Sequence, residues 1–185
     1  MDNDENLIVD DGHPWLAISL YTKKQLEIEA YFKNYGLETF IPRQYQHVEG
    51  ADGRPQRVVL RPVVHNLLFV KQTLAEAEMK NIVKSSDHKM RVLTQASLPN
   101  KYYLIPHNQM YEFRLMCNPE ITMRKFLSTE EARLKVGDEV YVKFGPLKGL
   151  TGRLVRSSKK YYLLKEIPGI SVMLKVSRWC CVPQS

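Results

Sequence analysis

Histidines, cysteines and paired carboxylates build many catalytic and metal sites, so their spacing along this chain limits its chemistry. The five histidines are scattered and none lies at a metal-ligand spacing from another; they are His13, His47, His65, His88 and His107. No glycine-rich loop opens a helix, and the chain has no nucleophile elbow. We therefore expect no enzyme activity, no metal and no cofactor.

The cysteine pattern points to a reducing compartment. Cys117, Cys180 and Cys181 form no Cys-x-x-Cys pair, which supports neither a zinc site nor a disulfide framework. Cys117 is expected to be a buried structural thiol. The acidic first residues lack the apolar stretch of a secretory signal, and no apolar run approaches the roughly 20 residues of a membrane span. We expect a cytoplasmic monomer with no membrane contact.

Charge is unevenly distributed along the chain, whose formal net charge is +7. Residues 1–13 contain five acidic and no basic side chains, a net charge of −5. Residues 135–185 contain ten basic and three acidic side chains, a net charge of +7. A basic body favours a polyanionic partner such as DNA or RNA, and a merely solubilising surface is the alternative. Segment 1–13 is predicted to be a disordered acidic tail.

Residues 14–117 show the pattern of an α+β domain. Strands are predicted at 15–21, 38–41, 45–48, 57–60, 63–70 and 90–93, and helices at 24–35, after Thr73 and after Pro106. The first helix places Ile28, Tyr31, Phe32 and Tyr35 on one face. Asp52-Gly53 predicts a hairpin turn. This order predicts helices packed against a mostly antiparallel sheet.

The rest of the chain changes character. Segment 118–134 loses apolar periodicity and is predicted to be an interdomain linker. Residues 135–185 show only strand signals, at 139–144, 151–156, 161–166, 170–176 and 178–182. Five short strands in about fifty residues predict a small β-barrel.

Three glycines mark the start of this second domain. Gly145, Gly149 and Gly152 lie between two alternating runs, in Val140-Tyr141-Val142-Lys143-Phe144-Gly145-Pro146-Leu147-Lys148-Gly149-Leu150-Thr151-Gly152. Glycine is used where φ must be positive or where backbones approach closely. The segment resembles the KOW motif, which opens an SH3-like barrel common in transcription and ribosomal proteins.

The ordered pair of domains resembles the bacterial NusG family over roughly residues 15–183. The segment Arg61-Pro62-Val63-Val64-His65-Asn66-Leu67-Leu68-Phe69-Val70 is similar to a strand of that family's NGN domain, and Lys135-Val136-Gly137-Asp138-Glu139-Val140 leads into the KOW motif. The resemblance implies an NGN-type α/β sandwich at 14–117 and a five-stranded KOW barrel at 135–185. It also implies a transcription elongation factor.

The resemblance assigns RNA polymerase as the partner of the NGN domain, through the clamp helices and a neighbouring contact to the gate loop. The residues at the matching positions are Ile18, Val64, His65, Leu67 and Phe69. For Ile18 alone, a position in the core is favoured. Such binding would stabilise one polymerase conformation and suppress pausing.

Nucleic-acid contacts are implied at two places. Tyr21, Lys23 and Lys24 match a basic and aromatic patch that faces non-template DNA in the family, where cations contact phosphate and a ring stacks on an unpaired base. Arg54 and Arg57, on the predicted hairpin, are a second candidate, for which solubilisation is the stronger interpretation.

The KOW partner site would include Phe144, Ile167, Pro168 and Ile170. Pro168 and Ile170 depart from the aromatic and basic residues usual in the general factor, which argues against Rho binding; a ribosomal protein is a further expected partner. The clamp-contact region departs as well, with Ser19 and Leu67 where relatives often have tyrosine and His65 where proline is usual. Together these departures favour a specialised antiterminator of the UpxY type, acting on a polysaccharide (capsular) operon.

Two other functions remain open from the sequence. One is the general NusG elongation factor. The other is a ribosome-associated, RNA-binding KOW protein that would contact ribosomal RNA through the basic side chains Lys143, Lys148, Arg153, Arg156, Lys159 and Lys160. For the elongation factor, nascent RNA is the alternative to non-template DNA as the nucleic-acid partner.

Overall fold

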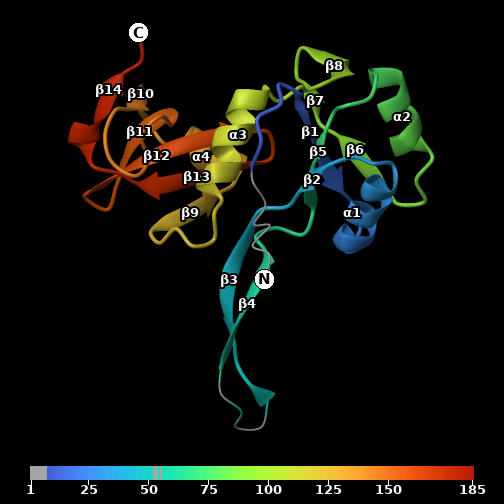
Figure 1. Ribbon diagram of the computed structural model, residues 1–185, viewed down its shortest axis with the longest axis horizontal. Coiled ribbons are helices and arrows are strands. Elements are labelled where there is room, and N and C mark those ends of the chain that lie inside the picture. Colours follow the sequence, from blue (N-terminus) through green and yellow to red (C-terminus); the bar gives the residue numbers. More distant parts are fainter. Residues whose placement is uncertain (1–7, 52–53, 55) are drawn as a thin grey trace. The chain divides into compact units, whose positions relative to one another are not determined.

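The structure, a computed structural model, describes residues 8–51, 54 and 56–185 and divides them into two compact units. The N-terminal unit comprises residues 14–104, and the C-terminal unit comprises residues 105–185 with residues 8–13. Each contains helices and antiparallel strands, as predicted for an α+β chain (Figure 1). The predicted Asp52-Gly53 turn lies outside the described residues.

A four-stranded antiparallel sheet forms the centre of the N-terminal unit. Strand β1 (Trp15–Leu20) lies between β5 (Leu67–Lys71) and β6 (Met90–Val92). Strand β2 (Thr39–Phe40) pairs with the other edge of β5, which gives the order β2-β5-β1-β6. The two central strands are apolar over nearly their whole length, so both faces of the sheet carry buried side chains.

Helices α1 (Gln25–Asn34) and α2 (Glu76–Lys84) supply the helical side of the core. Ile28 and Phe32 of α1 are buried, as the helical spacing predicted, whereas Tyr31 is half-buried and Tyr35, just after the helix, is exposed. Successive side chains of a strand point to opposite faces of the sheet, so every second residue of the strands packs against the buried helix residues. The cluster consists of Leu16, Ile18, Leu20, Ile28, Phe32, Leu37, Ile41, Leu68, Val70, Met79, Ile82 and Val92.

Two hairpins complete the N-terminal unit. Among the residues that the structure describes, strands β3 (Arg43–Val48) and β4 (Arg57–Pro62) pair with each other alone and run as a long ribbon (Figure 1). Their existence confirms the predicted hairpin. Strands β7 (Thr94–Gln95) and β8 (Leu98–Tyr102) form a second, short hairpin that was not predicted, because its exposed sequence lacks polar–apolar alternation.

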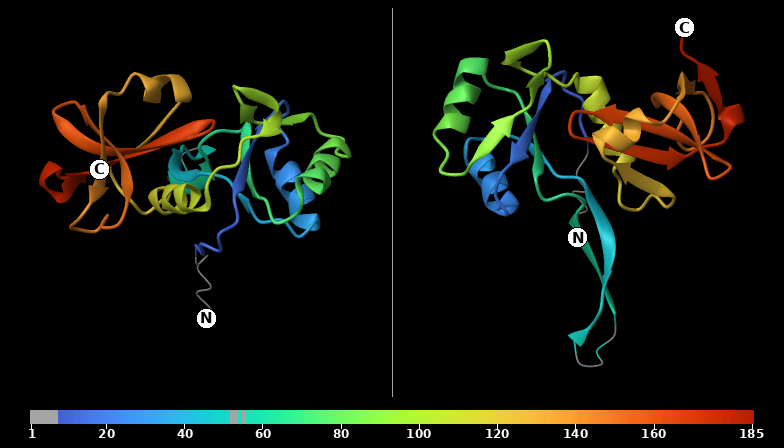
Figure 2. Two further views of the ribbon diagram at one scale, coloured as in Figure 1. Left: turned by 90° about the horizontal axis from the view of Figure 1, so that it is seen from above. Right: turned by 180° about the vertical axis from the view of Figure 1, so that it is seen from behind.

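The C-terminal unit is built on a six-stranded antiparallel sheet in the order β14-β10-β11-β12-β13-β9. Figure 2 shows this sheet from two further sides, in orange to red. The five predicted strands correspond to the last five in sequence, and β9 is an addition. Within the described residues no pairing joins β14 to β9, so a closed SH3-like barrel is not found and stays a prediction. The strands are β9 (Arg124–Leu127), β10 (Gly137–Val142), β11 (Thr151–Ser157), β12 (Lys160–Ile167), β13 (Ile170–Lys175) and β14 (Cys181–Pro183), with the 3-10 helix η2 (Arg178–Cys180) before β14.

The segment predicted as a linker, 118–134, contains β9 and the short helix α4 (Thr129–Arg133). Strand β9 pairs with β13, and Ala132 is buried against the sheet. The helix begins in a capping box: the Ser128 hydroxyl accepts from the Glu131 N–H at 3.2 Å, and the Glu131 carboxylate accepts from the Ser128 N–H at 2.8 Å. The hydrogen bond that the Ser128 N–H donates to the carboxylate is the largest cause that lowers the pKa of Glu131. The Ser128-x-x-Glu131 spacing is the sequence signal for this helix.

Helix α3 (His107–Met116) packs against β12 and β13, so it lies in the C-terminal unit although the sequence placed it in a domain ending at residue 117. A polar cluster links it to the sheet. Lys165 pairs with Glu112, and the Thr151 hydroxyl donates to the Glu112 carboxylate at 2.7 Å. The Lys165 ammonium also donates to the Thr151 hydroxyl at 2.9 Å.

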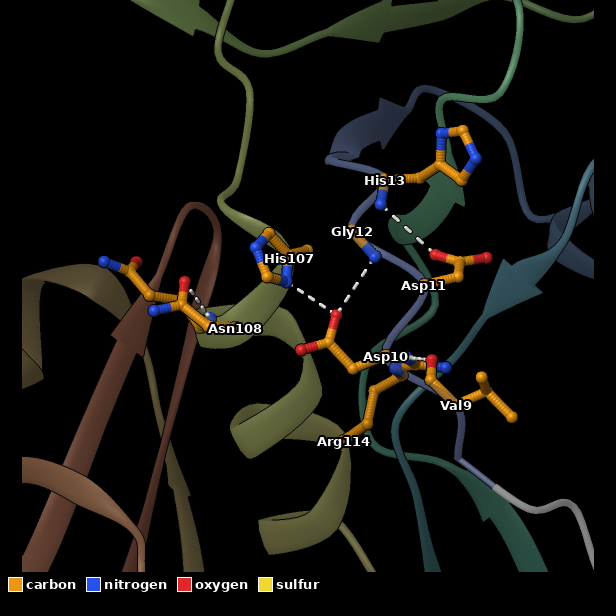
Figure 3. Close-up of polar contacts among 9 residues, drawn as sticks. Val9, Asp10, Asp11, Gly12, His13, His107, Asn108 and Arg114 are labelled. Carbon is orange, nitrogen blue, oxygen red and sulfur yellow. Dashed lines mark hydrogen bonds and ion pairs between the residues drawn. The ribbon is translucent and has the colours of Figure 1, made fainter.

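Residues 8–13 lie against α3 (Figure 3). Asp10 Oδ1 is 2.6 Å from His107 Nδ1, and Arg114 donates to the Val9 carbonyl at 3.1 Å. Asp10 also accepts from the Gly12 N–H at 3.3 Å. The rest of the predicted acidic tail, residues 1–7, lies outside the described residues.

The glycines of the KOW-like segment have the roles that the sequence predicted. Gly145 and Gly149 have φ values of +89° and +95°, which disfavour other residues. A Cβ on Gly152 would lie 2.5 Å from the Leu164 carbonyl oxygen of the neighbouring strand. Gly145 and Gly149 therefore shape the loop between β10 and β11, and Gly152 allows β11 to lie close to β12.

Candidate functional site

The five residues predicted to contact a protein partner fall into three environments. Ile18 pairs with Leu68, and both belong to the cluster under α1 and α2. Leu67 and Phe69 alternate with Leu68 and therefore point to the opposite sheet face. The structure thus brings Leu67 and Phe69 together and separates Ile18 from them, as the core interpretation of Ile18 expected.

This opposite face, which we call the second sheet face, is formed by Trp15, Ala17, Leu67 and Phe69, each less than 5% exposed. The Phe69 ring lies 6.4 Å from the ring of Phe40. Lys71 lies with its ammonium 5.5 Å from the Trp15 ring centroid and pairs with Glu38. Sequence reasoning missed Trp15, Phe40 and Lys71, although an uninterrupted apolar run is the signal of a strand buried on both faces.

Val64 and His65 lie in the loop before β5. Val64 is half-buried and His65 is exposed. The loop is tied to the start of α1 by Gln25, whose side-chain amide donates to the carbonyls of Val64 at 3.0 Å and Leu67 at 2.8 Å. Gln25 was not predicted, because a lone glutamine at a helix start carries no sequence signal.

Replacement of Gln25 by alanine should lower the free energy of unfolding by about 1–3 kcal/mol, because the two hydrogen bonds of a buried amide are lost. Chemical denaturation monitored by circular dichroism measures the change. Leu26→Ala is the control, since Leu26 is the next residue of the helix and is exposed. Equal stability of the two variants would contradict a tying role for Gln25.

The first nucleic-acid candidate forms a compact surface at the end of β1. Tyr21 is 63% exposed, and Lys23 and Lys24 are exposed beside it. The Tyr21 N–H donates to the Lys89 carbonyl at 3.1 Å, which brings a further exposed lysine to the same place. Lys24 is 3.4 Å from Glu27. We call Tyr21, Lys23, Lys24 and Lys89 the Tyr21 surface; Lys89 is its unpredicted member.

The second candidate lies on the long hairpin. Arg57 begins β4 opposite Val48, and Arg54 lies in the preceding loop. Both are exposed. The hairpin extends away from the four-stranded sheet (Figure 1). Arg54 and Arg57 lie at its loop end, between β3 and β4, whereas Tyr21 follows β1, so the two candidates do not form one surface.

The predicted KOW partner residues differ in exposure. Ile167 and Ile170 are buried and pair with each other across the turn between β12 and β13, while Pro168 is half-buried. Phe144 is 50% exposed, and its ring stacks with that of Trp179. Trp179 was not singled out from the sequence.

A family model described as transcription termination factor nusG matches residues 13–114, more than half of the chain. The chain belongs to the NusG family. The match spans the whole N-terminal unit and ends within α3. A search of curated proteins found no match. NusG-family membership gives the chain a role in transcription elongation or termination and points to RNA polymerase as its partner.

Two further kinds of feature bear on the function of the described residues, a metal site and a membrane span. In residues 8–51, 54 and 56–185 there is no cluster of three or more potential metal ligands. Burial raises the pKa of the Cys117 thiol, which keeps it protonated. Over the same residues, no helix is long and apolar enough to cross a bilayer.

Proposed function

We propose that this NusG-family chain is a cytoplasmic antitermination factor that binds RNA polymerase through its N-terminal unit. It suppresses pausing and promotes readthrough of early terminators in a polysaccharide-type operon. The observation that carries the proposal is the family match, which covers the complete N-terminal unit. The departures at Pro168 and Ile170 from the general factor's pattern support the specialised role.

Polymerase contacts are assigned to the loop before β5 and to the second sheet face. His65 is exposed and Val64 half-buried, so the loop is accessible in the chain alone. Leu67 and Phe69 are buried, so their contact with the clamp helices requires the second sheet face to open when polymerase binds. Apolar anchors that become buried at an interface centre can each contribute about 2 kcal/mol or more.

The Tyr21 surface is assigned to the non-template DNA strand. It combines an exposed ring with three exposed lysines, which suits stacking on an unpaired base and contact with phosphates. Arg54 and Arg57 are a less favoured contact, because a polar hairpin end is ordinarily solubilising.

Co-purification with RNA polymerase, compared with co-sedimentation with ribosomes, tests the proposal. We expect the full-length chain to bring down polymerase. Association with ribosomes alone would favour a ribosome-associated KOW protein, and readthrough that is equal on unrelated templates would favour a general elongation factor.

Alanine at Tyr21, Lys23 and Lys24 together should reduce terminator readthrough at least severalfold while polymerase co-purification changes little. The reason is that these exposed side chains would reach DNA, whereas other residues hold polymerase. Transcription in vitro on the cognate leader, at two salt concentrations, measures the effect. Lys33→Ala with Lys84→Ala is the control, because it removes exposed lysines elsewhere on the same unit. Readthrough equal to that of the parent chain would remove the Tyr21 surface from the site.

A further inference from the structure

Two exposed aromatic rings stack on each other at the surface of the C-terminal unit. Phe144 follows β10, and Trp179 lies in η2. Their ring centroids are 6.2 Å apart with an interplanar angle of 28°. The Lys143 N–H donates to the Cys180 carbonyl at 2.7 Å, which fixes the two segments side by side. Trp179 nevertheless remains 75% exposed, so most of the indole is open to a ligand.

One cation lies over this ring pair, and two further cations lie over a third ring, that of Tyr161. The Lys143 ammonium lies 5.7 Å from the centroid of the Phe144 ring. Arg178, next to Trp179 in sequence, lies 5.7 Å from the Tyr161 ring, and Arg156 lies 5.9 Å from the same ring. The basic–aromatic surface therefore consists of Lys143, Phe144, Arg156, Tyr161, Arg178 and Trp179.

The sequence segment that carries these rings has an excess of basic residues, and Asp138 and Glu139 of β10 precede it. Residues 141–185 contain nine basic side chains and one acidic side chain, a net charge of +8. That single carboxylate, Glu166, is paired with Arg153. No acidic residue of this segment is therefore left to compensate Lys143, Arg156 and Arg178, and a polyanion is the complementary partner.

We propose that the basic–aromatic surface binds single-stranded RNA, with unpaired bases stacked on Trp179 and Phe144 and phosphates contacting Lys143 and Arg178. Exposed rings interleaved with cations are the physical requirement for binding single strands, because every base offers a π-face and every linkage offers a charge. In a duplex the faces of the bases are stacked on one another, so they are not available to stack on Trp179 or Phe144.

A pocket lies beside Phe144 on this surface. Its volume is about 260 Å³, and its lining includes Phe144, Leu174 and Lys175. It offers an apolar wall and a further cation next to the stacked rings. The choice of RNA over single-stranded DNA rests on the proposed function, since a factor that travels with polymerase meets the transcript as its continuous unpaired strand.

Tryptophan fluorescence of the full-length chain tests the proposal directly. The chain has two tryptophans, and Trp15 is buried, so quenching by a bound base reports on Trp179. We expect a 12-nucleotide oligouridylate to quench this signal.

Fluorescence anisotropy with a labelled oligouridylate measures the affinity of variants. Trp179→Ala and Phe144→Leu should each weaken binding about tenfold. Lys143→Gln with Arg178→Gln should lower the log–log salt slope by about 1.4.

Val136→Ala is the matched control, because Val136 is an exposed apolar residue of the same unit outside the surface and is 90% exposed. It should bind RNA like the parent chain, and circular dichroism should show all variants folded. Absence of quenching, equal affinity for duplex RNA, or tighter binding of the matching DNA strand would overturn the proposal. The RNA-binding assay contains no polymerase, so a negative result would overturn RNA binding by this surface without bearing on the proposed binding of polymerase. Co-purification tests polymerase binding separately.

Discussion

Truncation of Phe69 to alanine should lower the free energy of unfolding of the N-terminal unit by about 3–5 kcal/mol. Phe69 is completely buried, and its backbone pairs with Ala17 on one side and Phe40 on the other. The paired backbone on both sides keeps β5 in place when the ring is removed, so truncation leaves a cavity on the second sheet face. Denaturant unfolding followed by Trp15 fluorescence, in a Trp179→Phe background, measures the loss.

Val58→Ala is the control, because Val58 lies on a strand of the same unit but is exposed, and its loss should change stability by less than about 0.5 kcal/mol. A loss below about 1 kcal/mol for Phe69→Ala would contradict tight packing of the second sheet face. Phe69→Leu keeps much of the volume, so it is the variant with which to measure polymerase binding in a folded chain.

The N-terminal unit was largely predictable because its signals are local. The spacing of Ile28 and Phe32 predicted α1, and the apolar run after Trp15 predicted β1. The faces of the sheet were not predictable in the same way. Ile18 and Phe69 are equally apolar, and only the pairing of Ile18 with Leu68 shows that they point in opposite directions.

The candidate sites, too, could be predicted only where their residues are neighbours in sequence. Tyr21, Lys23 and Lys24 are neighbours in sequence, so sequence reasoning could group them, whereas Lys89 joins them only through a strand pairing. Phe144 was singled out, but its partner Trp179 lies 35 positions later. Contacts between distant segments depend on the fold and leave no mark at either position alone.

Contacts between residues far apart in sequence also decide to which unit α3 belongs. Its amphipathic pattern predicts a helix and leaves its partner open. In the structure Lys165 of β12, which is 6% exposed, pairs with Glu112 of α3, and both bond to the Thr151 hydroxyl. This ion pair joins α3 to the sheet of the C-terminal unit, so breaking it tests whether α3 is attached to that sheet.

Lys165→Ala should therefore destabilise the attachment of α3 by about 3–5 kcal/mol, because it leaves the Glu112 carboxylate largely buried without its cation. Hydrogen exchange measured by mass spectrometry should show faster exchange in peptides from α3 and β12, with peptides from β5 unchanged. Lys165→Met combined with Glu112→Leu replaces both charges by apolar groups and should restore much of the protection. Lys160→Ala, an exposed lysine of the same strand, is the control. Unchanged protection of α3 in Lys165→Ala would mean that the helix is held by other contacts, as the domain boundary at residue 117 implied.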